Sequence, residues 1–257
     1  MTEVINRHLR SYHEQYWYAK NVLEKFLEIS NTKSLSICEV GPAEGGALKY
    51  FAEKGHRCYG VEFSEVRYNN SKFLNAKKDI HFVKGDITEP DTYMPQIGSP
   101  VDIIICRDVI EHIDTDQKFI GLQNMSNLLK PGGKMFISFP PKYSPYAGHQ
   151  QVAPKILVKL PYLHLLPDRI YIRYLSIMGM RVSSGQGLLD TKHKRLSIRN
   201  FEKMIATLHL NTNKRELFLI RPCYESRFHL RRMKAPFSKN MVLREYFTLG
   251  ALYCLTK

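Results

Sequence analysis

The sequence contains no long hydrophobic run. No apolar stretch among its 257 residues approaches the roughly 20 that a helix needs to cross a bilayer. The chain begins with polar residues such as Thr2, Glu3 and Arg7, so a secretory signal peptide is not expected. These absences favour a cytoplasmic protein, and the length suits one large domain or one domain with an inserted cap.

Cysteine is also scarce, with five residues in the whole chain. Cys38, Cys58 and Cys106 fall inside apolar stretches that are typical of buried strands. Buried cysteines in this setting indicate small core residues in a reducing compartment rather than a disulfide framework. No paired Cys and His spacing suggests structural zinc, so no metal site is predicted.

Acidic residues are few in the second half of the chain. Residues 1–141 contain 17 Lys and Arg against 18 Asp and Glu, whereas residues 142–257 contain 21 against 6. The net charge of +14 therefore comes entirely from the C-terminal half. Such asymmetry points to an anionic partner, which could be nucleic acid, a phosphorylated substrate or an acidic membrane face. A merely soluble basic surface is the alternative.

Short apolar runs alternate with longer amphipathic segments through the first half of the chain. An N-terminal helix over 4–29 comes first, and strands are predicted at 35–40, 57–62, 80–83, 101–106 and 134–139, with helices near 46–55, 64–77 and 115–130. A further helix near 197–209 and strands near 215–221 and 246–255 complete the pattern. Alternating strands and helices indicate an α/β fold with a mostly parallel sheet covered on both faces.

The fold class is therefore a Rossmann-like, seven-stranded, mostly parallel sheet with a helical cap inserted after the fifth strand. We divide the chain into an N-terminal helix over the cofactor site (1–33), a cofactor-binding core (34–141), a substrate cap (142–195) and a completion of the sheet (196–257). Pro140-Pro141 marks the break, because a central strand cannot continue through two prolines.

The predicted cap mixes apolar and basic residues. Segments 152–166 and 168–180 indicate two short helices separated by Pro167. Apolar residues flanked by basic ones can form interfacial helices that rest on an anionic membrane. Alternatively, the apolar face packs on the main domain and the basic residues face water; the sequence slightly favours this second arrangement.

The most distinctive motif is Ile37-Cys38-Glu39-Val40-Gly41-Pro42-Ala43-Glu44-Gly45-Gly46, in which a buried strand enters a glycine-rich turn. Glycine lets the backbone turn tightly and approach a ligand, and the following helix N-terminus favours an anionic group. Glu62 ends the second strand 21 residues after Gly41, where a carboxylate can accept ribose hydroxyl protons. These two features alone also suit a dinucleotide-binding enzyme.

Two further segments separate the alternatives. Asp86 ends the third strand, and the run Arg107–Ile113 follows the fourth, ahead of Leu129-Lys130-Pro131-Gly132-Gly133. With these five motifs in order, the sequence resembles the class I S-adenosylmethionine-dependent methyltransferases, especially the small-molecule branch typified by ubiquinone-biosynthesis enzymes. The resemblance covers residues 34–140 well and 197–257 more loosely. The strict GxGxxG and phosphate-loop spacings are absent, which weighs against NAD and ATP.

This resemblance implies that S-adenosylmethionine is the cofactor and that its methionine part is held by Glu39, Gly41, Ala43 and Gly45. The family favours glycine at the position of Ala43, so the loop could sit slightly farther from its ligand here.

The same resemblance assigns the adenosine end. Glu62 would bind the ribose, with Phe63 beside it, Asp86 would lie near the adenine amino group, and Ile87 would supply a backbone N–H. Arg107 would lie beside the sulfonium and contact it through its backbone.

Two histidines are candidates for a general base, because histidine titrates in the useful range. His149 follows the fifth strand at the carboxyl edge of the sheet, and His112 follows the fourth. Each could instead be a hydrogen-bonded loop residue, and Glu111-His112 could cap the next helix.

The leading hypothesis is methyl transfer to a small-molecule or glycan acceptor, directed to oxygen, with an anionic, phosphate- or lipid-linked acceptor favoured. An RNA methyltransferase is the first alternative, although no recognisable RNA-binding module is present. Methylation of a base amine is disfavoured, because the Asn/Asp-Pro-Pro-aromatic segment expected after strand four is replaced by Arg107-Asp108-Val109-Ile110.

The second alternative is a non-catalytic protein that binds the cofactor and uses the domain to interact with a partner. Peripheral contact with an anionic membrane and the oligomeric state are left open.

Overall fold

A computed structural model describes residues 2–29, 33–148, 153 and 155–257. Its centre is one eight-stranded sheet with the order β3-β2-β1-β4-β5-β8-β6-β7. The first five strands are mutually parallel, and the last three pair antiparallel. The strands are β1 (Ser36–Val40), β2 (Arg57–Glu62), β3 (Ile80–Lys84), β4 (Val101–Arg107), β5 (Leu129–Phe139), β6 (Asn211–Ile220), β7 (Met233–Lys234) and β8 (Gly250–Thr256).

The predicted number of seven strands is wrong by one. The additional strand, β7, contains only Met233 and Lys234 and pairs with β6 at the edge of the sheet. Two exposed residues leave no alternating pattern that sequence periodicity could detect. The fifth strand also begins earlier than expected, because the Lys130-Pro131-Gly132-Gly133 segment lies within β5 instead of preceding it.

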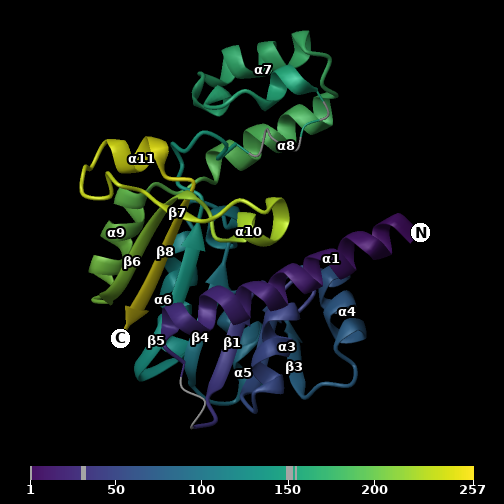
Figure 1. The fold of residues 1–257 in the computed structure, drawn as a ribbon, viewed down its shortest axis with the longest axis vertical. Helices are drawn as coiled ribbons and strands as arrows, with labels where there is room; N and C mark the ends of the chain where they lie inside the picture. Colours follow the sequence, from purple (N-terminus) through teal and green to yellow (C-terminus); the bar gives the residue numbers. More distant parts are fainter. Residues whose placement is uncertain (1, 30–32, 149–152, 154) are drawn as a thin grey trace.

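Helices cover both faces of the sheet (Figure 1). One face packs against α1, η1, α2 and α3, and the other against α5, α6 and α9. The helical elements of the main domain are α1 (Thr2–Tyr18), η1 (Ala19–Leu23), α2 (Glu24–Leu27), α3 (Gly46–Glu53), α4 (Glu65–Leu74), η2 (Pro90–Thr92), α5 (Met94–Ile97), η3 (Ile110–His112), α6 (Lys118–Leu128), α9 (Ile198–Thr207), α10 (Cys223–Phe228) and α11 (Leu243–Phe247).

Each central strand supplies both cores, because successive side chains point to opposite faces. In β1 every residue is buried, with Ile37 on the α3 side and Cys38 on the α6 side. Cys58 and Cys106 are likewise buried and unpaired, as the sequence predicts. This double burial explains why the parallel strands appear in the sequence as continuous apolar runs.

The cap lies beyond the carboxyl ends of the parallel strands, with α7 farthest from the sheet (Figure 1). It contains η5 (Ile156–Lys159), η6 (Leu163–Leu165), α7 (Asp168–Ile177) and α8 (Val182–His193). Its apolar residues form a third cluster, separate from the two cores of the sheet.

The expected helix over 152–166 is wrong, and the described part of that segment forms only two short 3-10 turns. Pro161 separates the turns, because proline has no N–H to donate and clashes with a preceding carbonyl. The structure has α7 close to the second predicted helix, but α8 lies in a stretch where no helix was expected. Among the described residues, no helix is long and apolar enough to cross a membrane.

Candidate functional site

A cavity of about 470 Å³ opens where the first four strands end. Ligands of open α/β sheets bind at this carboxyl edge, because the loops there converge around the point where the strand order reverses. The wall comes from the ends of β1 to β4 and from the far end of α8: Val40, Gly41, Val61, Glu62, Phe63, Ser64, Arg67, Gly85, Asp86, Ile87, Thr88, Asp108, Val109, His112, Ile113, Asp114, Gln117 and Lys194.

The loop after β1 takes an unusual backbone path. Gly41, Ala43 and Gly45 all have positive φ angles of 66°, 49° and 78°. Such angles favour glycine, so the glycines of this motif are required by backbone conformation. At Gly41 a Cβ would also lie 2.5 Å from Cγ2 of Val109. Ala43 adopts the same left-handed conformation with a methyl group, which explains why a family with this loop would favour glycine there.

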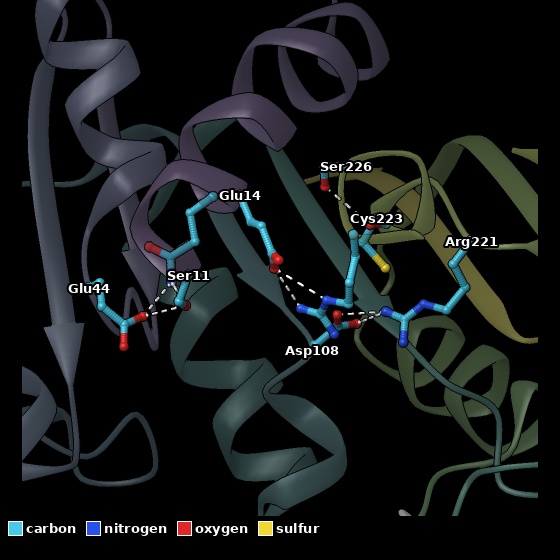
Figure 2. A network of polar contacts seen from close by, with 9 residues as sticks. Ser11, Glu14, Glu44, Asp108, Arg221, Cys223 and Ser226 are labelled. Carbon is cyan, nitrogen blue, oxygen red and sulfur yellow. Dashed lines mark hydrogen bonds and ion pairs between the residues drawn. The ribbon is translucent and has the colours of Figure 1, made fainter. Parts of the chain in front are cut away.

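Helix α1 holds this loop from outside. Ser11 donates to Glu44 at 2.7 Å, and Gln15 donates to the same carboxylate at 2.9 Å (Figure 2). The Oε1 atom of Gln15 accepts the N–H of Gly46 at 2.9 Å. The helix N-terminus was expected to favour an anionic group, but the N–H of Gly46 at the start of α3 already donates to a side chain of α1.

Glu62 is buried at the end of β2 and lines the cavity. Its Oε2 accepts the N–H of Ala43 at 3.0 Å, and its Oε1 accepts the N–H of Ser64 at 2.9 Å. Each carboxylate oxygen can accept more than one hydrogen bond, so both retain capacity for ligand hydroxyls. The side chain thus joins the glycine-rich loop to the chain segment that follows β2.

Glu39 lies in β1, is 2% exposed and does not line the cavity. Its Oε2 has no hydrogen-bond partner among the described residues. Burial raises the pKa of Glu39 to about 7, partly opposed by Arg107 and reinforced by Glu62. A buried carboxylate oxygen without a hydrogen-bond partner is energetically costly when it is ionised. A cationic group of a bound ligand would offset that cost by pairing with it.

The ends of β2 and β3 supply the opposite part of the wall. Asp86 accepts both the N–H and the hydroxyl of Thr88 through Oδ1 at 2.8 Å, which fixes the carboxylate. Ile87 is buried beside it. Phe63 is 73% exposed although its ring lines the cavity, so it offers a free aromatic face.

A partly buried ion pair lies at the cavity wall, just after the end of β4. Asp108 has a φ of 55° and binds Arg221 through both carboxylate oxygens, at 2.6 and 2.5 Å (Figure 2). Although burial opposes ionisation, Arg221 and Arg107 hold the pKa of Asp108 below its ordinary value. Arg107 itself does not line the cavity; its guanidinium lies 4.7 Å from the ring centre of Tyr18 on α1.

The structure describes only one of the two histidines that were candidates for the general base. His112 lines the cavity, and its pKa is lowered by partial burial and then by the charge of Arg195. It is therefore neutral at neutral pH, in the form that can accept a proton. His149 lies outside the described residues.

Comparison with known proteins identifies the family of the chain. A family model described as a methyltransferase domain matches residues 10–178. The chain belongs to this methyltransferase family. A curated relative, an uncharacterized methyltransferase of Geobacillus sp. strain WCH70, is 26% identical over 131 residues, which cover 49% of this chain and 58% of the relative. The match thus spans a little over half the length of that methyltransferase.

Solved structures of other methyltransferases share the fold of this chain over nearly its whole length. The magnesium protoporphyrin IX methyltransferase of Synechocystis PCC 6803, solved with bound S-adenosylmethionine, has a TM-score of 0.54 and 13% identity over 98% of this chain and 82% of that one. The plantazolicin methyltransferase BpumL, solved with a substrate analogue and S-adenosylhomocysteine, has a TM-score of 0.56 and 12% identity over 100% and 88%. The fold is that of class I S-adenosylmethionine-dependent methyltransferases.

The residues of the cavity fit S-adenosylmethionine, which is bound in the Synechocystis structure. Glu62 and Asp86 present fixed carboxylates to the cavity, as a ribose and an adenine amino group require. The orphaned Oε2 of Glu39 suits the ammonium group of the methionine part. Gly41, Glu62, Phe63, Asp86 and Ile87 line the cavity together, whereas Ala43 and Gly45 shape the loop behind it.

Several residues of the cavity wall were not expected from the methyltransferase motifs. Ser64 and Thr88 closely follow predicted strands, so their positions after a strand end were an available signal, whereas Arg67 and Gln117 lie near the starts of predicted helices. Lys194 had no such signal, because it comes from the end of the cap. Its Nζ pairs with Asp114 at 2.8 Å, which connects the cap to the core at the cavity wall.

Proposed function

We propose that this chain transfers the methyl group of S-adenosylmethionine to an oxygen atom of an anionic small-molecule or glycan acceptor, with a phosphate group as the favoured anion. The observation that carries the proposal is a second hollow of about 830 Å³ between α1 and α10. Its lining is rich in basic and aromatic side chains: Arg7, Arg10, Ser11, His13, Glu14, Trp17, Glu225, Ser226, Arg227, Phe228 and His229. We call it the α1–α10 groove.

The carboxylates of this groove are already neutralised. Glu14 pairs with Arg227 at 2.8 Å, and Glu225 pairs with Arg232 at 2.6 Å. Arg7 and Arg10 are exposed and form no ion pair among the described residues. The two guanidinium groups are therefore available for an anion, and arginine suits phosphate because its planar fork can donate two parallel hydrogen bonds.

We propose that the α1–α10 groove opens toward the reacting end of the cofactor site. Its walls are α1, which carries Tyr18 over Arg107, and α10, which begins two residues after Arg221. Figure 2 shows Glu14 of α1 and Cys223 of α10 in the neighbourhood of the Asp108–Arg221 pair. An acceptor anchored by Arg7 or Arg10 could extend from the groove toward the end of β4, where the resemblance places the sulfonium.

Little chemistry is required of the protein beyond alignment. When bound, S-adenosylmethionine supplies a methyl group that its sulfonium already activates. The protein then has to orient the acceptor oxygen for in-line displacement and accept its proton. His112 and His149 remain the candidates for that base, and residues 142–195 are proposed to recognise the acceptor.

The test is methyl transfer from labelled S-adenosylmethionine into fractionated extract of the native cell. The proposal expects label in a small-molecule or glycan fraction that binds an anion-exchange resin, and loss of labelling after phosphatase treatment of that fraction. Label that enters RNA and disappears with ribonuclease would replace the proposal with the RNA alternative. Cofactor binding without transfer to any fraction would favour the non-catalytic alternative.

Variants refine the same assay. Arg10→Ala should raise the KM for the labelled acceptor with little change in cofactor affinity, whereas Lys203→Ala on the distant helix α9 should change neither. His149→Ala and His112→Gln should each be compared for turnover at saturating cofactor. If turnover survives in one of them, that histidine is not the base.

A further inference from the structure

The outermost part of the cap exposes large aliphatic side chains. Ile156 is 80% exposed and Ile177 68%, and four more aliphatic residues in or directly after the same two elements are exposed as well: Leu157, Leu160, Ile170 and Ile172. They come from η5 with its flanking residues and from α7. We call the exposed side chains of residues 155–160 and of α7 the cap face.

The two segments of the cap face adjoin each other. The Oη of Tyr174 on α7 donates to the carbonyl oxygen of Leu157 at 2.7 Å. In Figure 1, α7 forms the end of the molecule farthest from the sheet. The exposed aliphatic residues are therefore grouped on one projecting part of the fold, and contiguous exposed apolar surface usually marks an interaction site.

The buried cluster of the cap does not include these side chains. That cluster is completed by buried residues, among them Val158, Tyr171 and Leu175 from the same two segments. The sequence slightly favoured an apolar face packed against the main domain. The structure instead buries one set of apolar residues within the cap and leaves a second set in solvent.

The charges of the cap face are of one sign. Lys155, Lys159, Arg169 and Arg173 are exposed between the aliphatic residues, and none forms an ion pair among the described residues. Asp168 is the single acidic residue between positions 142 and 181. It is already paired with Lys192 at 2.6 Å and with His193 at 3.0 Å.

We infer that the cap face docks on the surface of an anionic lipid membrane. Aliphatic side chains interspersed with lysine and arginine match the two layers of such a surface, because the former enter the acyl boundary while the latter meet lipid phosphates. Two copies of the face would bring like charges together, which opposes self-association. Single-stranded nucleic acid would call for exposed aromatic platforms, and here the exposed side chains are aliphatic.

The test is co-sedimentation of the full chain with large vesicles, without cofactor or acceptor, so that its result is independent of methyl transfer. Vesicles of phosphatidylcholine alone are compared with vesicles that also contain phosphatidylglycerol. The inference expects binding to the anionic vesicles only, weakened by added salt. Ile170→Ser with Ile177→Ser should lower the partition coefficient about tenfold or more, and Arg169→Gln with Arg173→Gln should weaken binding to the anionic vesicles and reduce its salt dependence, because two of the four basic side chains are lost.

Matched control variants distinguish docking through the cap face from nonspecific adsorption to vesicles. Phe73→Ser removes a side chain that is 82% exposed on α4, far from the cap face, and Lys203→Gln removes a charge on α9. Both should bind vesicles as the unaltered chain does, and all variants should keep the thermal unfolding midpoint. Absence of binding to anionic vesicles overturns the inference, as does concentration-dependent dimerisation that only the two-isoleucine variant abolishes. Equal loss of vesicle binding in the control variants overturns it too.

Discussion

The carboxylate of Glu62 accepts the backbone N–H of Ala43 at 3.0 Å. One side chain therefore serves both as a wall of the cofactor cavity and as the anchor of the loop that follows β1. Its other oxygen accepts the N–H of Ser64, so the carboxylate is held on both sides before any ligand arrives. A ribose bound there would meet a preorganised acceptor, which lowers the cost of binding.

Glu62→Gln should weaken the affinity for S-adenosylmethionine or S-adenosylhomocysteine by roughly tenfold or more. An amide offers only one acceptor atom, so it cannot serve Ala43, Ser64 and two ribose hydroxyls together. Isothermal titration calorimetry measures the effect. Glu65→Gln, three residues later on the exposed surface of α4, is the matched control and should leave the affinity unchanged. Unaltered affinity in Glu62→Gln would remove the ribose assignment.

Ala43→Gly should stabilise the protein by about 0.5–1 kcal/mol, because glycine adopts the left-handed conformation without the penalty that a Cβ incurs. The backbone N–H that Glu62 accepts is retained, so cofactor affinity should be maintained or improve. Ala47→Gly in α3 provides the opposite case and should destabilise by about 1 kcal/mol or more. Chemical denaturation measures the change in unfolding free energy for both variants, which should have opposite signs. A loss of stability in Ala43→Gly would show that the positive φ angle of Ala43 does not strain the backbone.

Much of the fold could be predicted from this sequence, because the pattern of residues within each strand identifies that strand. The strands β1 and β4 are buried on both faces, and β2 and β3 are buried toward their carboxyl ends, so each strand contains apolar residues followed by a glycine or a charged residue. Gly41, Glu62 and Asp86 were found because each stands at the end of such a strand. The two-residue strand β7 and the turns around Pro161 are too short to produce a periodic signal.

The parts of the site that could not be predicted depend on long-range contacts. Asp108 and Arg221 pair across 113 residues of sequence, and Lys194 reaches the cavity wall from the far end of the cap. The support of the glycine-rich loop by Ser11 and Gln15 is also long-range. No local pattern at either partner specifies such pairs, because they arise only when the sheet brings the elements together.

Cofactor affinity should rise as the pH increases from about 5.5 to about 7, because Glu39 must lose its proton to pair with an ammonium group. Its folded-state pKa of about 7 lies above the ordinary value of 4.5, so the cofactor-free protein binds a proton there that the unfolded chain releases. The stabilisation from this group is complete below about pH 4.5 and is lost as the pH rises through about 7.

Glu39→Gln should flatten this pH dependence and lower the affinity at pH 7 by roughly tenfold. The measurement is the dissociation constant of the cofactor across the pH range for both proteins, with Glu53→Gln on the exposed surface of α3 as a control. A slope in Glu39→Gln as steep as in the unaltered chain would assign the titration to another group.

Asp102→Asn should lower stability without affecting the site. Asp102 lies in β4 at the end opposite the cavity, accepts the N–H and the hydroxyl of Ser36 at 2.8 and 2.6 Å, and pairs with Lys130 at 2.9 Å. Burial opposes its ionisation, but these partners outweigh burial and lower its pKa to about 2.

Because that folded-state pKa lies below the ordinary value of 3.8, the stabilisation is present above about pH 4 and is lost as the pH falls through about 2. We expect Asp102→Asn to cost about 1 kcal/mol at pH 7, allowing for solvent screening of a partly exposed pair. The difference in unfolding free energy between the two proteins should shrink as the solution is acidified from about pH 5 toward pH 2. Urea denaturation at several pH values measures it, and cofactor affinity at pH 7 should be equal in both. A difference that stayed constant down to about pH 2 would show that the asparagine acts through packing and that the charge of Asp102 contributes nothing.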